Sequence, residues 1–120
     1  MKTIFLIFSL LVSFAGKSQE WVSGSQFDFG EIEKGVPVST TFVFKNNSKE
    51  PIVVEMVRTS CGCAAPNWSE EPVGPGEIGE IKVVFDARKS GFFRKRIKVF
   101  FVGKRKAQKL TISGEVFEYE

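Results

Sequence analysis

The chain has 120 residues, of which 17 are Lys or Arg and 14 are Asp or Glu, so its formal net charge is +3. This length fits one domain, and the apolar and charged fractions of 42% and 26% exclude a disordered chain or a membrane bundle. The chain contains no His, which excludes every catalytic or metal site that needs an imidazole, and its small charge surplus does not indicate nucleic-acid binding.

The N-terminal residues are typical of an export signal. Lys2 is followed by an uncharged, mostly apolar run over residues 4–14. A membrane-spanning helix needs about 20 residues, so this run is too short to cross a bilayer and instead has the length of a signal-peptide apolar region. The small residues that follow place a cleavage site after Ala15 or after Ser18.

We therefore predict a signal peptide at residues 1–18 and one mature domain at residues 19–120, with no membrane span in the mature chain. An N-terminal membrane-anchoring helix or a buried strand is the alternative interpretation of the apolar run. Export implies a periplasmic, cell-surface or secreted protein, and in such a compartment a pair of cysteines can oxidise.

Apolar and polar residues alternate with a period of two along the mature chain, and no stretch has the spacing of an amphipathic helix. The first predicted strand lies at residues 27–29 and ends at Gly30, and the next runs from Val38 to Asn46. Turn clusters separate the later strands, and Gly114 is the expected site of a β-bulge. The residues expected to face the core from the second strand onward are Phe42, Phe44, Ile52, Val54, Met56, Ile81, Val83, Phe85, Phe93, Ile97, Val99, Phe101, Leu110, Ile112 and Val116.

These segments give six to seven short strands, with turns at the spacing expected of a sandwich. The sequence therefore predicts an all-β fold, an immunoglobulin-like β-sandwich of about seven antiparallel strands. The basic residues at 94–98 and 104–109 are interpreted as the solvent face and edge of strands, where Lys discourages unwanted strand pairing. A patch that binds polyanions is the alternative.

The only reactive side chains lie in one loop, Cys61-Gly62-Cys63. A disulfide between the two cysteines is one interpretation. Two extended residues span roughly 7 Å between Cα atoms, at the limit of about 6.8 Å for a disulfide, so we expect the chain to bend at Gly62, which glycine allows. So small a ring adds little stability through chain entropy and is strained, which makes it a better candidate for redox exchange than for structural support.

Two further interpretations of this loop stay open. Two thiolates suit Cu(I), whereas a structural zinc site needs four ligands, usually Cys and His, and the chain has two Cys and no His. Alternatively the cysteines are reduced and buried, as Cys often is, with Trp68 covering them and Gly62 and Pro66 supporting the loop.

Several motifs along the chain are shared with a known family. They are Phe27-Asp28-Phe29-Gly30-Glu31-Ile32-Glu33-Lys34-Gly35, Phe42-Val43-Phe44-Lys45-Asn46-Asn47-Ser48, Ser60-Cys61-Gly62-Cys63 with Pro66, Pro75-Gly76-Glu77, Gly91-Phe92-Phe93 and Leu110-Thr111-Ile112-Ser113-Gly114. These motifs resemble the strands and turns of Hydin-type immunoglobulin-like domains and, as a set, the bacterial domain-of-unknown-function family 1573, which is common in exported proteins of Bacteroidetes-type bacteria. The resemblance covers about residues 27–116; it implies the immunoglobulin-like fold and export, and it implies no activity.

The functional expectation is an exported binding or scaffolding protein rather than an enzyme. The alternation places no two carboxylates together as general acid and base, so we predict no catalytic residues and no cofactor. The expected partner is an envelope or extracellular protein of unknown identity, not a nucleic acid, and the chain itself is expected to be a monomer. The alternative is a thiol-disulfide or copper-handling role at Cys61 and Cys63.

Overall fold

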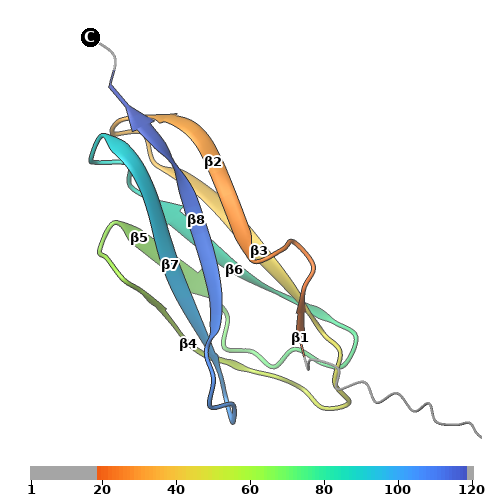
Figure 1. The fold of residues 1–120 in the computed structure, drawn as a ribbon. Helices are drawn as coiled ribbons and strands as arrows, with labels where there is room; N and C mark the ends of the chain where they lie inside the picture. The colour runs from red at the N-terminus through yellow and green to blue at the C-terminus, as the bar shows by residue number, and fades with distance from the viewer. Residues whose placement is uncertain (1–18, 119–120) are drawn as a thin grey trace, which may run out of the picture.

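The computed structural model describes residues 19–118, and this part of the chain folds into eight strands joined by turns and loops (Figure 1). The strands form two sheets of four. The order of the strands is β1-β3-β6-β5 in the first sheet and β2-β8-β7-β4 in the second. Their bounds are β1 (Gln19–Trp21), β2 (Gln26–Glu33), β3 (Val38–Asn46), β4 (Val54–Thr59), β5 (Ala64–Trp68), β6 (Ile78–Phe85), β7 (Gly91–Phe101) and β8 (Gln108–Phe117).

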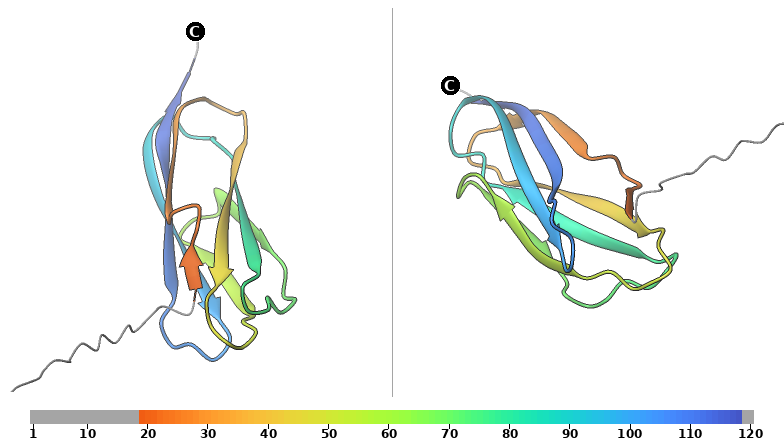
Figure 2. Two further views of the ribbon diagram at one scale, coloured as in Figure 1. Left: turned by 90° about the vertical axis from the view of Figure 1, so that its right-hand side faces the viewer. Right: turned by 60° about the horizontal axis from the view of Figure 1, so that its bottom comes forward.

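The two sheets face each other as the layers of a sandwich, which Figure 2 shows from two further directions. The strands from β1 to β5 alternate between the sheets, so that only β5 with β6 and β7 with β8 pair directly with the strand that follows. Paired strands are antiparallel except β2 and β8, which run parallel. The all-β, immunoglobulin-like sandwich predicted from the sequence is confirmed, with one parallel pair that alternation does not reveal.

Aromatic rings connect the two layers of the core. Phe44 of β3 is 1% exposed, and its ring meets Trp21 and Phe101 edge-on, with centroids 5.4 and 5.3 Å away. Phe85 of β6 stacks on Phe93 of β7 at 4.1 Å. β3 and β6 belong to the first sheet and β7 belongs to the second. The Phe44–Phe101 and Phe85–Phe93 contacts therefore hold the two sheets together.

The predicted inward-facing residues are buried or packed against this core, with one exception in β4. Val54 pairs with Phe101, but Met56 pairs with Phe100, so the register shifts between them. This β-bulge turns Val57 into the core, where it is 5% exposed, and leaves Met56 only half-buried. The expectation that Met56 faces the core is wrong because a period of two does not reveal an inserted residue.

A second bulge lies in β2, which continues to Glu33 instead of ending at Gly30 as the sequence suggested. The register against β8 shifts between Asp28 and Glu31, and Gly30 has a φ of 71°. Gly114, where the sequence predicts a bulge, lies on β8 beside this shift. The additional residue, however, belongs to β2 and not to β8. A Cβ on Gly114 would lie 2.9 Å from the Gly30 carbonyl oxygen, so the close approach requires glycine.

Asn46, at the end of β3, organises the polar turn that follows. It is fully buried, and its Nδ2 donates hydrogen bonds of 2.8 Å to the carbonyl oxygens of Glu50 and Val73. Its Oδ1 accepts from the backbone N–H of Ser48 at 2.8 Å and from the Ser48 hydroxyl at 2.7 Å. All the bonding capacity of the amide is used, which is how a buried polar side chain becomes stabilising.

Two predictions concern the N-terminal region. The predicted signal peptide at residues 1–18 lies outside the described residues and stays a prediction. In the part of the chain from residue 19 to residue 118, no helix has the length and apolar character needed to span a membrane.

Candidate functional site

The Cys61-Gly62-Cys63 loop lies where the chain crosses from one sheet to the other. β4, which ends at Thr59, is an edge strand of the second sheet, and β5, which begins at Ala64, is an edge strand of the first. The loop therefore spans one side of the sandwich (Figure 1).

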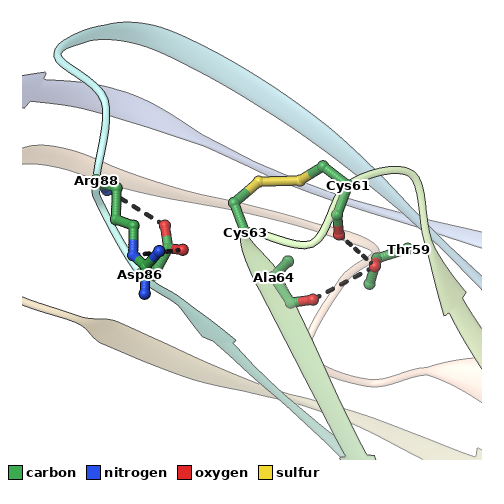
Figure 3. The surroundings of a disulfide bond; sticks show 6 residues. All are labelled: Thr59, Cys61, Cys63, Ala64, Asp86 and Arg88. Carbon is green, nitrogen blue, oxygen red and sulfur yellow. Dashed lines mark hydrogen bonds and ion pairs between the residues drawn. A yellow bond between two sulfur atoms is a disulfide. The ribbon is translucent and has the colours of Figure 1, made fainter.

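Within this loop the two cysteines are joined to each other by a disulfide (Figure 3). Their Cα atoms are 5.3 Å apart, inside the usual range for a disulfide. Both residues are partly exposed, and Cys63 packs against the edge of the hydrophobic core. With the sulfurs bonded together there is no thiolate to bind Cu(I), so copper binding would require the reduced form.

Hydrogen bonds fix both ends of the loop. Thr59 Oγ1 lies 2.8 Å from the carbonyl oxygen of Cys61 and 3.3 Å from that of Ala64, so one hydroxyl bridges the loop (Figure 3). On the other side, the backbone N–H of Asp86 donates to the Cys63 carbonyl at 2.9 Å. The loop is thus tied to β4 and to the end of β6.

Gly62 is exposed at the tip of the loop. A Cβ built at this position would meet nothing within 4 Å, and its φ lies outside the left-handed region that favours glycine. The bend expected here is present, but the backbone freedom of glycine is not what produces it. What the missing side chain provides is open space beside the disulfide.

The other two residues expected to support the loop lie along β5. Pro66 pairs with Val83 and Trp68 with Ile81, which places Trp68 at the end of β5 remote from Cys63. Trp68 is half-buried against the core and lines a separate hollow of about 570 Å³. Pro66 is tolerated because β5 is an edge strand, where one side of the backbone makes no ladder hydrogen bonds. The cysteines are not under Trp68.

A hollow on the outer face of the second sheet adjoins the loop. We call it the basic hollow. Its volume is about 580 Å³, it contains no carboxylate, and Ser60 connects it to Cys61. Its lining residues are Arg58, Thr59, Ser60, Arg94, Arg96, Lys98 and Phe100.

The register explains how the cations of the basic hollow come together. Arg94, Arg96 and Lys98 occupy alternate positions of β7 and therefore share one face, and Arg58 of β4 pairs with Lys98. None of these cations belongs to the two ion pairs formed among residues 19–118, which are Lys34–Glu118 and Arg88–Asp86. The sequence places the three β7 cations on one face; it could not place Arg58 beside them, because that depends on the pairing of distant strands.

Metal-ligating side chains do not cluster in the part of the chain that the structure describes. No group of three or more Cys, Asp or Glu side chains is close enough to hold a metal ion. Chemically, the site offers a partly exposed disulfide next to a recess that four cations and no carboxylate line. On its other side Arg94 lines a second recess, which contains the carboxylates of Asp28, Glu31 and Glu115.

The family comparison covers most of the chain. Residues 21–116 match the family described as "Protein of unknown function (DUF1573)". The chain belongs to this family. The resemblance stated from the motifs is thereby confirmed. No curated protein is similar enough in sequence to be matched.

Solved structures similar to this DUF1573 domain share its fold at low sequence identity. The ASH/PapD-like domain 7 of human CEP192 has a TM-score of 0.70 and 12% identity, with 98% of this chain and 100% of that chain covered. A protein of unknown function from Porphyromonas gingivalis W83 has a TM-score of 0.68 and 12% identity, covering 84% of this chain. The VesB protease of Vibrio cholerae has a TM-score of 0.65 and 15% identity, covering 82%.

The extent of these matches limits what they establish. The DUF1573 chain spans 50% of the Porphyromonas structure and 32% of the Vibrio protease. At such low identity the similarity establishes the PapD-like, immunoglobulin-like fold and nothing about activity.

Proposed function

We propose that the protein is an exported, single-domain binding or scaffolding module that recognises its partner through the basic hollow. The observation that carries this proposal is the cluster of four cations, Arg58, Arg94, Arg96 and Lys98, in one recess without a carboxylate among its lining residues. Charges of one sign repel each other in the free protein, so an anionic partner both relieves this repulsion and gains attractive contacts.

The composition of the basic hollow favours binding over catalysis. Its hydroxyl residues, Thr59 and Ser60, have no imidazole or carboxylate among the lining residues to act as a base. Arg, in contrast, is well suited to recognition, because its planar guanidinium can bind a carboxylate through two parallel hydrogen bonds.

Affinity capture from the native envelope tests this proposal. The tagged protein is compared with the charge-reversed variant Arg94→Glu/Arg96→Glu and with the matched variant Lys104→Glu/Lys106→Glu, which changes the same charge in the exposed turn after β7. We expect the wild type and the matched variant to capture the same partner and the hollow variant to lose it. Capture of the same partner by all three proteins would refute recognition through the basic hollow.

A second candidate function is thiol-disulfide exchange at Cys61 and Cys63. The favouring observation is that the disulfide lies in a partly exposed loop, with open space at Gly62 and the basic hollow beside it. Nearby cations stabilise a thiolate and so make it a better leaving group.

The exchange would oxidise a dithiol of the partner. One partner thiolate attacks a sulfur of the bridge, which forms a mixed disulfide and releases the other Cys as a thiolate that takes up a proton. The second partner thiolate then attacks the mixed disulfide and releases the remaining Cys. Two electrons pass from the partner, which gains a disulfide, to Cys61 and Cys63, which end as thiols.

Equilibration in glutathione buffers of known potential, followed by counting of free thiols, tests the second function. An exchange role requires a midpoint between about −300 and −120 mV, the range of exchange-active bridges. A midpoint well below about −300 mV would make the disulfide purely structural. The variant Cys61→Ser/Cys63→Ser serves as the control; because the closed loop is so short, we expect it to fold with a loss of at most about 2 kcal/mol.

A further inference from the structure

One margin of the second sheet carries an unpaired strand edge. β4 pairs with β7 only from Ile97 to Phe101, because the chain leaves the sheet after Thr59 to form the disulfide loop. The preceding part of β7, Gly91–Arg96, pairs with β8 on one side and with no strand of the described residues on the other. Figures 1 and 2 show this part of β7 at the margin of the sandwich.

The side chains along this edge alternate in a defined pattern. Phe92, Arg94 and Arg96 point to the outer face, where their partners on β8 are Glu115, Ser113 and Thr111. Phe92 is 84% exposed, and both arginines are exposed as well. Along the edge, the outer face therefore presents one apolar ring followed by two cations, and the basic hollow continues this positive charge. The carboxylates nearest to Arg94 lie on its other side, toward β8 and β2, in the recess that it shares with Asp28, Glu31 and Glu115.

We propose that this edge of β7 accepts an extended, acidic segment of a partner protein as an additional strand. The proposal rests on the function proposed above and names its partner chemistry. An added strand gains main-chain hydrogen bonds from the unpaired edge. Its side chains on the outer face stand directly opposite those of β7, with Cβ atoms about 4.5–5.5 Å apart.

Register then defines the sequence that fits. Alternate residues of a strand repeat at about 6.6–6.8 Å in both chains. Two acidic residues separated by one spacer residue can therefore oppose Arg94 and Arg96 at the same time. The next alternate position faces Phe92 and favours an apolar side chain, since the ring is otherwise in water.

The same charges exclude other strands. Lys and Arg on an open edge discourage pairing with neutral or basic segments, and Lys95 adds a cation on the opposite face of β7. A second copy of this edge would place its own arginines against Arg94 and Arg96. Selectivity for an acidic segment thus comes from repulsion of the alternatives as well as from attraction.

The disulfide loop has a structural part in this arrangement. β4 would cover the whole of β7 if it continued past Thr59, but the loop directs it to the other sheet instead. The Thr59 hydroxyl, 2.8 Å from the Cys61 carbonyl, fixes the point of departure. Ser60 and Cys61 therefore lie where the added strand would end.

Synthetic peptides test the proposal. The probe has Glu at two alternate positions and Leu at the next, with Thr as spacer, and its dissociation constant is measured by fluorescence anisotropy with the full chain. Two further peptides have the same sequence and carry backbone N-methyl groups. The first is methylated on the Glu and Leu residues, and the second is methylated on the Thr spacers. Because the N–H groups of a strand alternate between its two edges, strand addition predicts that one N-methylated peptide loses binding and the other keeps it.

The protein variants provide the matched comparison. We expect Arg94→Glu/Arg96→Glu to weaken peptide binding by about tenfold or more, and Lys104→Glu/Lys106→Glu to leave it unchanged at matched ionic strength. Hydrogen exchange with bound peptide should show new protection between Phe92 and Arg96. A Lys-for-Glu peptide should not bind.

The outcomes separate this inference from the function on which it rests. Absence of peptide binding, or equal binding of both N-methylated peptides, overturns strand addition, while loss of the captured partner with the Arg variant would still support the basic hollow. Conversely, binding of only one of the two N-methylated peptides supports the edge site. If the Arg94→Glu/Arg96→Glu variant nevertheless captures the same envelope partner as the wild type, the proposed function is overturned.

Discussion

Two glycines, Gly62 in the disulfide loop and Gly79 in β6, differ in what surrounds the missing side chain. At Gly62 an added Cβ meets nothing within 4 Å, whereas at Gly79 it would overlap the ring of Phe44. We expect Gly62→Ala to keep the disulfide and to change the free energy of unfolding by no more than about 0.5 kcal/mol.

Gly79→Ala is the comparison and should cost about 1–3 kcal/mol through overpacking. Urea denaturation of both variants, with free thiols counted before and after reduction, checks the prediction. Loss of the disulfide in Gly62→Ala would show that the loop needs a backbone conformation other than the one described here.

At the scale of residues, the sequence located the reactive loop but not its surroundings. Cys61 and Cys63 stand out by their spacing alone. That Trp68 lies at the remote end of β5 depends on the pairing of β5 with β6, and that Arg58 joins the basic hollow depends on the pairing of β4 with β7. Neither long-range register is encoded in a local pattern.

Among the turns, the one after β3 depends on a single buried amide. Removing the Asn46 side chain takes one hydrogen-bond donor from each of the carbonyls of Glu50 and Val73, and it takes the acceptor from the N–H and hydroxyl of Ser48. We expect Asn46→Ala to lower the free energy of unfolding by about 2–4 kcal/mol. The exposed neighbour Asn47, which donates to Glu20 Oε1 at 3.1 Å, is the control, and Asn47→Ala should change stability by less than about 0.5 kcal/mol. Equal effects in chemical denaturation would contradict a structural role for Asn46.

Long strands were predictable because alternation persists over them, as in β3, β6 and β7. Shorter or interrupted elements were not. β1 has three residues and β5 has five including Pro66, too few for a period to be evident. In β2 and β4 an added residue reverses the alternation. Judged by alternation alone, β2 therefore ends at Gly30, and in β4 Met56 takes the inward position that Val57 occupies in the structure.

Across the whole molecule, phenylalanine has two different roles. Phe44 is 1% exposed and contacts rings from β1 and β7, whereas Phe92 is 84% exposed. Phe44→Ala should cost about 3–5 kcal/mol, and Phe92→Ser should leave stability within about 0.5 kcal/mol of the wild type. Thermal and urea unfolding of the two variants checks this contrast. A large loss of stability in Phe92→Ser would mean that this ring supports the fold and is not a free contact surface.

The fold as a whole follows from the sequence more fully than the site does. Burying phenylalanines on alternating strands requires two facing layers whatever the details of pairing. The order of strands within each layer, and so the edge that remains open, depends on contacts between segments far apart in the chain.

The parallel pairing of β2 with β8 has a consequence for the order in which the domain can be completed. Among the described strands, β2 has its sheet neighbour only in β8, the last of them, so a polypeptide emerging N-terminus first leaves β2 unpaired until β8 has appeared. β4 and β7 can pair with each other earlier, but a ribosome or translocation channel that still holds β8 keeps β2 out of the second layer.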